Sequence, residues 1–188
     1  MSDANNPYAS AAPEIVEAPV VAAPADDLQT LSEEAARLRQ QGRSGANWFY
    51  WIAGLSLVNT VILLAGGTTF FVCGLGLSRE VNGIAILIAE EEPGIATVIK
   101  GIAFVMNLVI AGAVVGFGWI SGKGYTVPFI IGMVIYACDA LLFLVVGEMM
   151  SFGFHIFALW NMWNGVAAFR KLNAFERAWH EEAAIASA

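Results

Sequence analysis

Residues 126–147 read TVPFIIGMVIYACDALLFLVVG, and they are the clearest indication of the fold class. Its one charged side chain is Asp139, and the rest of the stretch is almost entirely apolar. A helix of about 20 mostly apolar residues is long enough to cross the hydrocarbon core of a bilayer. The stretch therefore predicts a transmembrane helix, and it raises the question of how a carboxylate is accommodated inside that helix.

Three other stretches have the same apolar character. They are residues 48–66 (WFYWIAGLSLVNTVILLAG), 95–120 (IATVIKGIAFVMNLVIAGAVVGFGWI) and 150–170 (MSFGFHIFALWNMWNGVAAFR). The links before and after residues 126–147 are short, so we expect the last three spans to be antiparallel neighbours. The predicted fold is an all-α membrane protein, an antiparallel four-helix transmembrane bundle spanning residues 47–170.

The composition agrees with this assignment. Of the 188 residues, 58% are apolar and 13% are charged, whereas a soluble domain has about 45–50% apolar and about 25% charged residues. The mean hydropathy is +0.67. The net charge of −7 repels the phosphate backbone of nucleic acids, so we expect the lipid bilayer, and no nucleic acid, as a partner.

Lysine and arginine residues predict the orientation, because they are concentrated in cytoplasmic loops. Two of them, Arg79 and Lys100, fall on one predicted side. The others fall on the opposite side and are Arg37, Arg39, Arg43, Lys123, Arg170, Lys171 and Arg177. The bias predicts a multi-pass protein of the inner membrane with both termini in the cytoplasm.

The segments outside the spans are less apolar. Residues 1–26 are rich in Ala and Pro and predict a disordered cytoplasmic tail. Asp27 as an N-cap and Gly42 as a helix end predict an amphipathic cytoplasmic helix over 27–42. Residues 171–188 predict a helical cytoplasmic tail. Two alternatives remain open for these tail helices: they contact each other, or they lie along the membrane surface or fray.

The connection between the first two spans, residues 67–94, is ambiguous. Its apolar pieces, FFVCGLGL at 70–77 and IAILIA at 84–89, are each too short to cross a bilayer. We expect one or two interfacial amphipathic helical pieces over 69–91, lying on or dipping into the outer leaflet. The alternative extends the first span through Leu77.

Asp139 lies near the middle of its span, where an ionisable group costs several kcal/mol unless it is paired, protonated or hydrated. We therefore expect it to face the other helices and to form an intramembrane polar cluster. The expected members, in addition to Asp139, are Asn59, Lys100, Asn107, His155 and Asn161. Two interpretations remain open, namely a hydrogen-bonded layer that fixes helix packing and an ion or proton pathway.

Other motifs predict packing rather than chemistry. Gly112 and Gly116 form a GxxxG pair, which we expect to pack helices together inside the bundle. His155 has no second histidine within the spans to complete a haem or metal site. Ser151 and His155 lie one helical turn apart, but nothing in the sequence supplies an oxyanion site. We expect no catalytic residue, no metal and no cofactor, and therefore no enzyme.

The stretches WFYWIAGLSLVNTVILLAGG (48–67), FFVCGLGLSREVNGIA (70–85) and NNPYAS (5–10) resemble uncharacterised small multi-span bacterial membrane proteins. The resemblance covers residues 47–170 and implies neither an activity nor a functional residue. We predict a non-enzymatic assembly or accessory component that contacts a membrane-protein partner or a second copy of itself. The alternative is a small ion- or proton-coupled transporter or channel centred on Asp139.

Overall fold

The computed structural model describes residues 25–67 and 74–187, and all regular structure within these residues is helical. The predicted all-α class is therefore confirmed. The helices are α1 (Ala25–Leu64), α2 (Gly76–Glu91), the short 3-10 helix η1 (Pro93–Ile95), α3 (Ala96–Ser121), α4 (Thr126–Val145) and α5 (Met149–Ala186).

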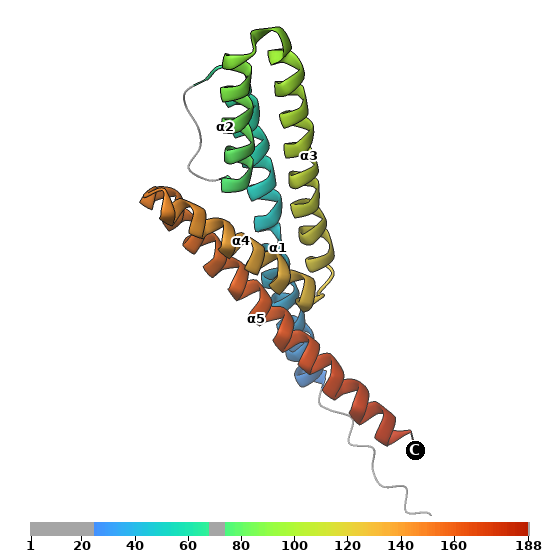
Figure 1. Ribbon diagram of the computed structural model, residues 1–188. Coiled ribbons are helices and arrows are strands. Elements are labelled where there is room, and N and C mark those ends of the chain that lie inside the picture. Colours follow the sequence, from blue (N-terminus) through green and yellow to red (C-terminus); the bar gives the residue numbers. More distant parts are fainter. Residues whose placement is uncertain (1–24, 68–73, 188) are drawn as a thin grey trace, which may run out of the picture.

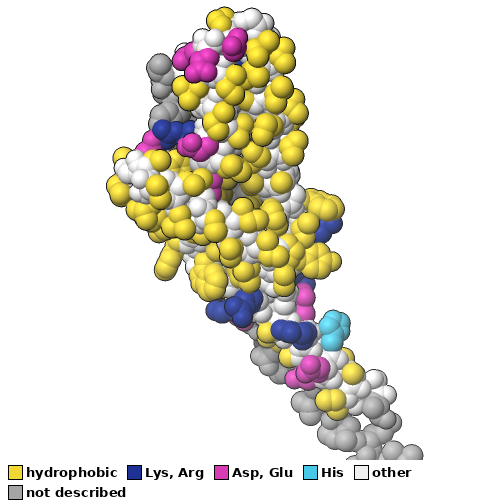
Figure 2. Space-filling model, viewed as in Figure 1, with side chains coloured by type: hydrophobic (Ala, Val, Ile, Leu, Met, Phe, Trp, Pro, Cys, Tyr) yellow, Lys and Arg dark blue, Asp and Glu magenta, His cyan; other side chains and the backbone are white. Residues whose placement is uncertain are grey.

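Three segments are long and apolar enough to cross a membrane, which fits a membrane protein. They are Gln29–Leu64, Pro93–Ser121 and Thr126–Val145. Apolar side chains also cover much of the outer surface, as Figure 2 shows for one face of the molecule. The fourth predicted span, 150–170, lies in α5, whose polar residues make it less apolar than these three segments.

The helices form two groups that meet at α1. Helices α2 and α3 lie beside the second half of α1, whereas α4 and α5 form a hairpin that crosses α1 obliquely (Figure 1). Buried apolar side chains of α1, α4 and α5, including Phe49, Phe129 and Met162, fill the crossing. A Cβ atom on Gly45 would lie 2.6 Å from the Cα atom of Gly165, so glycine is what allows α1 and α5 to approach so closely.

Helix α1 does not stop at Gly42, contrary to the sequence-based prediction of a separate helix over 27–42. It begins at Ala25, so Asp27 is not its N-cap, and it continues unbroken into the first span. A Cβ atom on Gly42 would lie 2.5 Å from the ring of Phe169. The glycine therefore makes room for a side chain of α5 and does not end a helix.

Helix α1 ends at Leu64, and Gly66 follows in the left-handed region at a φ of 87°. The alternative in which the first span extends through Leu77 is therefore wrong. Part of the predicted connection, residues 68–73, lies outside the described residues, and so does nearly all of the predicted disordered tail. The rest of the connection is mainly α2, which runs alongside α1 and α3 (Figure 1), followed by the start of η1.

The first part of α1 and the last part of α5 lie side by side beyond the crossing. Arg39 donates a hydrogen bond to Glu176 at 2.6 Å, and Leu38 and Leu172 are buried nearby in the same core cluster. Of the two alternatives for the tail helices, the structure has the helix–helix contact.

Candidate functional site

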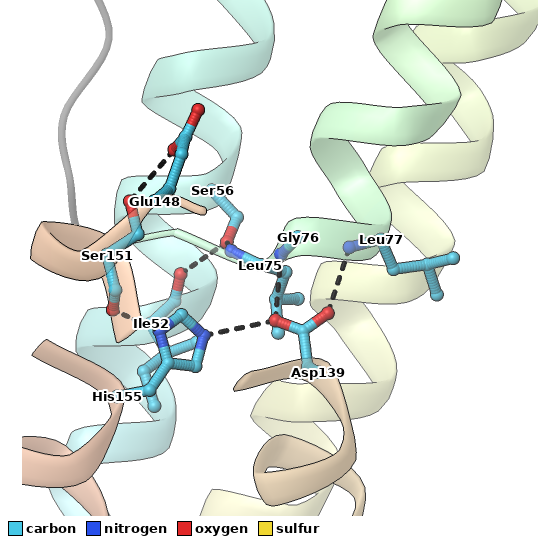
Figure 3. A network of polar contacts seen from close by, with 9 residues as sticks. All are labelled: Ile52, Ser56, Leu75, Gly76, Leu77, Asp139, Glu148, Ser151 and His155. Atoms are coloured by element: carbon cyan, nitrogen blue, oxygen red, sulfur yellow. Dashed lines mark hydrogen bonds and ion pairs between the residues drawn. The ribbon is translucent and has the colours of Figure 1, made fainter. Parts of the chain in front are cut away.

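The most distinctive polar site lies where α4 meets the beginning of α2. The Asp139 carboxylate accepts the backbone N–H of Gly76 at 2.7 Å and that of Leu77 at 2.9 Å (Figure 3). The first N–H groups of a helix have no partner within the helix, and the helix dipole favours a negative charge there. Asp139 therefore caps α2 from a different helix, with 7% of the residue exposed.

Gly76 allows this contact because it has no side chain. A Cβ atom at this position would lie 2.9 Å from the ring of Phe143 and 3.3 Å from an oxygen of Asp139. The neighbour would have to move by several tenths of an ångström, and the backbone would then withdraw from the carboxylate. Residue 76 therefore fixes how closely α2 can approach α4.

His155 of α5 completes the shell around Asp139. Its Nε2 lies 3.1 Å from Asp139 Oδ2, and its Nδ1 lies 2.8 Å from the carbonyl oxygen of Ser151. A carbonyl oxygen can only accept a hydrogen bond, so Nδ1 is the donor. The other contact then holds one proton between Nε2 and Oδ2, as an imidazolium–carboxylate pair or as a neutral pair.

Aromatic rings enclose the imidazole. The ring of Tyr136 stacks on it at a centroid distance of 4.3 Å and an interplanar angle of 19°, and the ring of Phe143 lies 4.9 Å away. His155 is fully buried. The Asp139–His155 pair is thus held in one geometry by packing as well as by hydrogen bonds.

A second set of polar side chains continues from this pair across α1, α2 and α3. The Ser56 hydroxyl accepts the backbone N–H of Leu75 at 2.8 Å. Asn82 of α2 donates to the Thr60 hydroxyl of α1 at 3.1 Å, and Asn107 of α3 donates to the amide oxygen of Asn82 at 2.8 Å. Polar contacts therefore join all three helices through the buried face of α2.

An ion pair lies at the edge of the site. Arg79 of α2 pairs with Glu148 at the α4–α5 turn, and both side chains are partly exposed. The Ser151 hydroxyl donates to Glu148 at 3.3 Å. In Figure 2, charged side chains interrupt the apolar surface near the tip of the α4–α5 hairpin. The site therefore extends from the buried Asp139 toward the surface.

The structure brings together only part of the predicted cluster. Asp139 and His155 are in contact, and Asn107 belongs to the adjoining set of polar contacts. Asn161 does not join them, because its amide donates to the Phe157 carbonyl of its own helix at 2.8 Å. Lys100 lies near the start of α3, partly exposed, and is absent from the described contacts of Asp139.

Asn59 lines a small cavity next to the site, together with Ser78 and Asn82 of α2. The sequence-based cluster did not include Ser56, Thr60 or Asn82. The spacing of Ser56 and Thr60, one helical turn apart, is a signal that could have identified them. No residue type in the sequence indicates the backbone N–H groups that donate to Asp139.

The predicted packing of Gly112 and Gly116 inside the bundle does not occur. A Cβ atom at either position would meet no atom within 4 Å among the described residues. The GxxxG pair therefore makes no close helix contact among the described residues, whereas Gly45 and Gly165 pack closely against each other.

In the part of the chain that the structure describes, no group of three or more His, Cys, Asp or Glu side chains is placed to hold a metal ion. Comparison of the chain with models of protein families, with curated proteins and with solved structures gave no match. The function must therefore be inferred from the residues of this chain.

Proposed function

We propose that the chain is a multi-pass protein of the inner membrane with four spans, the fourth being the first half of α5. If α1, α3 and α4 each cross once, the chain leaves α4 on the side opposite the start of α1. The Arg39–Glu176 contact shows that the second half of α5 lies beside the first part of α1. The chain therefore has to cross the membrane once more within α5, which supports a fourth span. The lysine and arginine bias supports a cytoplasmic location for both termini.

Within this arrangement, α2 is a re-entrant helix. Its buried residues are small or polar, namely Gly76, Ser78, Asn82, Ala85 and Ala89. The exposed residues in its middle include the apolar Ile84, Leu87 and Ile88. Small and polar residues between helices and apolar residues outside are typical of a helix packed inside a bilayer. The charged Arg79 and Glu80 lie near its beginning, and Arg79 pairs with Glu148.

The role we propose is that of a non-enzymatic assembly or accessory component. The observation that carries this proposal is that the Asp139 carboxylate is satisfied within the chain, by Gly76, Leu77 and His155. A carboxylate with these three partners holds α2, α4 and α5 together, so its role is in helix packing. We therefore assign function to the outer surface of the protein rather than to this site.

The surface that suits a partner is a groove of about 260 Å3 between the ends of α1 and α5. Leu31 and Ala35 line it on one side, and Phe175 and Trp179 line it on the other. Trp179 is 51% exposed. An aromatic side chain at this exposure is a typical anchor for a helix of a partner protein or of a second copy.

The test is site-specific photo-crosslinking in cells. A photoreactive residue replaces Trp179 in the groove, and in a control variant it replaces Ile131, an exposed apolar residue of α4. We expect one discrete protein adduct from position 179 and none from position 131. A protein that purifies in mild detergent as a single monomer, with no adduct from position 179, would contradict the proposal.

A second candidate function is proton- or ion-coupled transport at Asp139. The observation that favours it is the single proton held between His155 Nε2 and Asp139 Oδ2 in an apolar surrounding. In proteoliposomes, wild-type flux that Asp139→Asn abolishes without a change in stability would support this candidate. If the wild type shows no flux and Asp139→Asn is destabilised, transport is rejected and Asp139 acts in helix packing alone.

A further inference from the structure

A small cavity lies between α1, α2, α4 and α5, and it is lined by Phe143, whose ring packs against His155. The volume open to the centre of a water molecule is about 20 Å3. About 10–15 Å3 of such volume is enough for one water. Polar side chains from α1, α2 and α5 line the cavity, namely Ser56, Asn59, Ser78, Arg79, Asn82 and Ser151.

Ser78 provides independent evidence that the cavity takes a ligand. The residue is 3% exposed, and its hydroxyl has no hydrogen-bond partner among the described residues. Nearly all buried hydroxyl groups in folded proteins have a partner, which is either protein or ordered water. The Ser78 side chain lines the cavity, so a ligand there is within its reach.

The charges beside the cavity argue for a neutral ligand. Arg79 is paired with Glu148, and the Asp139 carboxylate is matched by His155 and two backbone N–H groups. An added ion would therefore meet no uncompensated charge. The volume also excludes a molecule much larger than water.

We infer that this cavity binds one ordered water molecule, which accepts or donates a hydrogen bond at Ser78 and joins α1, α2 and α5. The water extends the contacts of α2 beyond the Asp139 cap. This inference does not depend on the proposed function, because it concerns the packing of α2 in any role of the protein.

The test compares two buried serines whose hydroxyls have no partner among the described residues. Ser78 lines the cavity, whereas Ser121 at the end of α3 does not. If water is bound, Ser78→Ala removes a real hydrogen bond and lowers Tm by about 2–4 °C, the shift that follows from losing one such bond. Ser121→Ala removes an unpaired hydroxyl and leaves Tm unchanged or slightly raised.

A Ser78→Ala variant with an unchanged or raised Tm overturns the inference, because deleting an unsatisfied hydroxyl in a dry cavity costs nothing. A crystal structure of the full chain provides a second measurement on the wild type. We expect a water peak within hydrogen-bonding distance of Ser78 Oγ. A well-defined cavity with no water peak beside Ser78 would overturn the inference.

Discussion

Asp139 is accommodated inside an apolar helix because another helix begins at its carboxylate. Asp139→Asn replaces one acceptor oxygen with an NH2 group, which then faces a backbone N–H or His155. Leaving a buried donor without its acceptor costs about 1–3 kcal/mol, so we expect the free energy of unfolding to fall by about 1–3 kcal/mol. The measurement is unfolding in mixed micelles with increasing dodecyl sulfate.

Asn161→Ala is the matched control for this prediction. Asn161 is also a polar residue of the apolar region, but its amide binds a carbonyl of its own helix. We expect a change within about 0.5 kcal/mol, as for most substitutions away from a buried network. An equal loss of unfolding free energy in the two variants would show that the Asp139 cap on α2 contributes no more to stability than the Asn161 side chain does.

The hydrogen-bond partners of His155 also predict which ring nitrogen carries a proton. Since Nδ1 faces the carbonyl oxygen of Ser151, it has to be protonated whether the ring is neutral or charged. Solid-state 15N NMR of the histidine-labelled protein in bilayers measures this directly. An Nδ1 signal typical of an unprotonated nitrogen at position 155 would be inconsistent with the geometry in Figure 3.

The sequence shows that the Asp139 carboxylate needs hydrogen-bond partners, but it does not show which groups those partners are. A carboxylate in an apolar stretch requires partners, and this follows from the cost of burying a charge. The sequence offered side chains as partners, and His155 is one of them. The other two are backbone N–H groups of Gly76 and Leu77, which every residue except proline carries, so no residue type indicates them.

Within the helices, replacing glycine by alanine is expected to have opposite effects at two positions. Gly45→Ala places a methyl group against the backbone of Gly165, and we expect a loss of about 1–3 kcal/mol from overpacking. Gly112→Ala points into open space, and we expect a gain of about 0.5–1 kcal/mol from reduced backbone freedom. Dodecyl sulfate unfolding of both variants checks the prediction, and a large loss at position 112 would reveal a packing partner on that face.

The placement of α2 in the bilayer can be tested with spin labels on a chain in which Cys73 and Cys138 are replaced by serine. A label on Leu87→Cys is expected to contact oxygen, which dissolves in lipid, more readily than a water-soluble nickel chelate. The apolar outer face of α2 is the reason. A label on Glu91→Cys, at the end of the helix, should show the reverse preference. If the nickel chelate reaches the label at position 87 as readily as the label at position 91, the outer face of α2 contacts water and not lipid.

The helices that the sequence located best are those that are apolar throughout. The stretch 95–120 corresponds to Ala96–Ser121 and 126–147 to Thr126–Val145, because a long apolar run constrains both the type and the length of an element. The boundary at Gly42 was wrong, since glycine signals a helix end in sequence but serves here to admit Phe169. The contact between Gly42 and Phe169 depends on how α1 and α5 pack in three dimensions, so the sequence around Gly42 cannot predict it.

For the molecule as a whole, charge and chain direction support the proposed four-span topology. Glu90 and Glu91 are the last residues of α2 and Glu92 follows them, at the turn toward α3 and far from the Arg39–Glu176 pair (Figure 1). With Cys73 and Cys138 replaced by serine, we expect Gln29→Cys and Glu182→Cys to react with an impermeant maleimide in inverted membrane vesicles. Glu91→Cys should react in intact cells whose outer membrane has been made permeable.

The decisive comparison is between positions 29 and 182, because it counts the crossings without reference to hydropathy. Reaction of position 182 from the outside, with position 29 reacting from the inside, would mean that α5 does not cross. The first part of α1 and the last part of α5 could not then lie side by side, and the Arg39–Glu176 contact could not form. Reaction of both positions from the inside is expected because this contact requires the two helix ends to share one compartment.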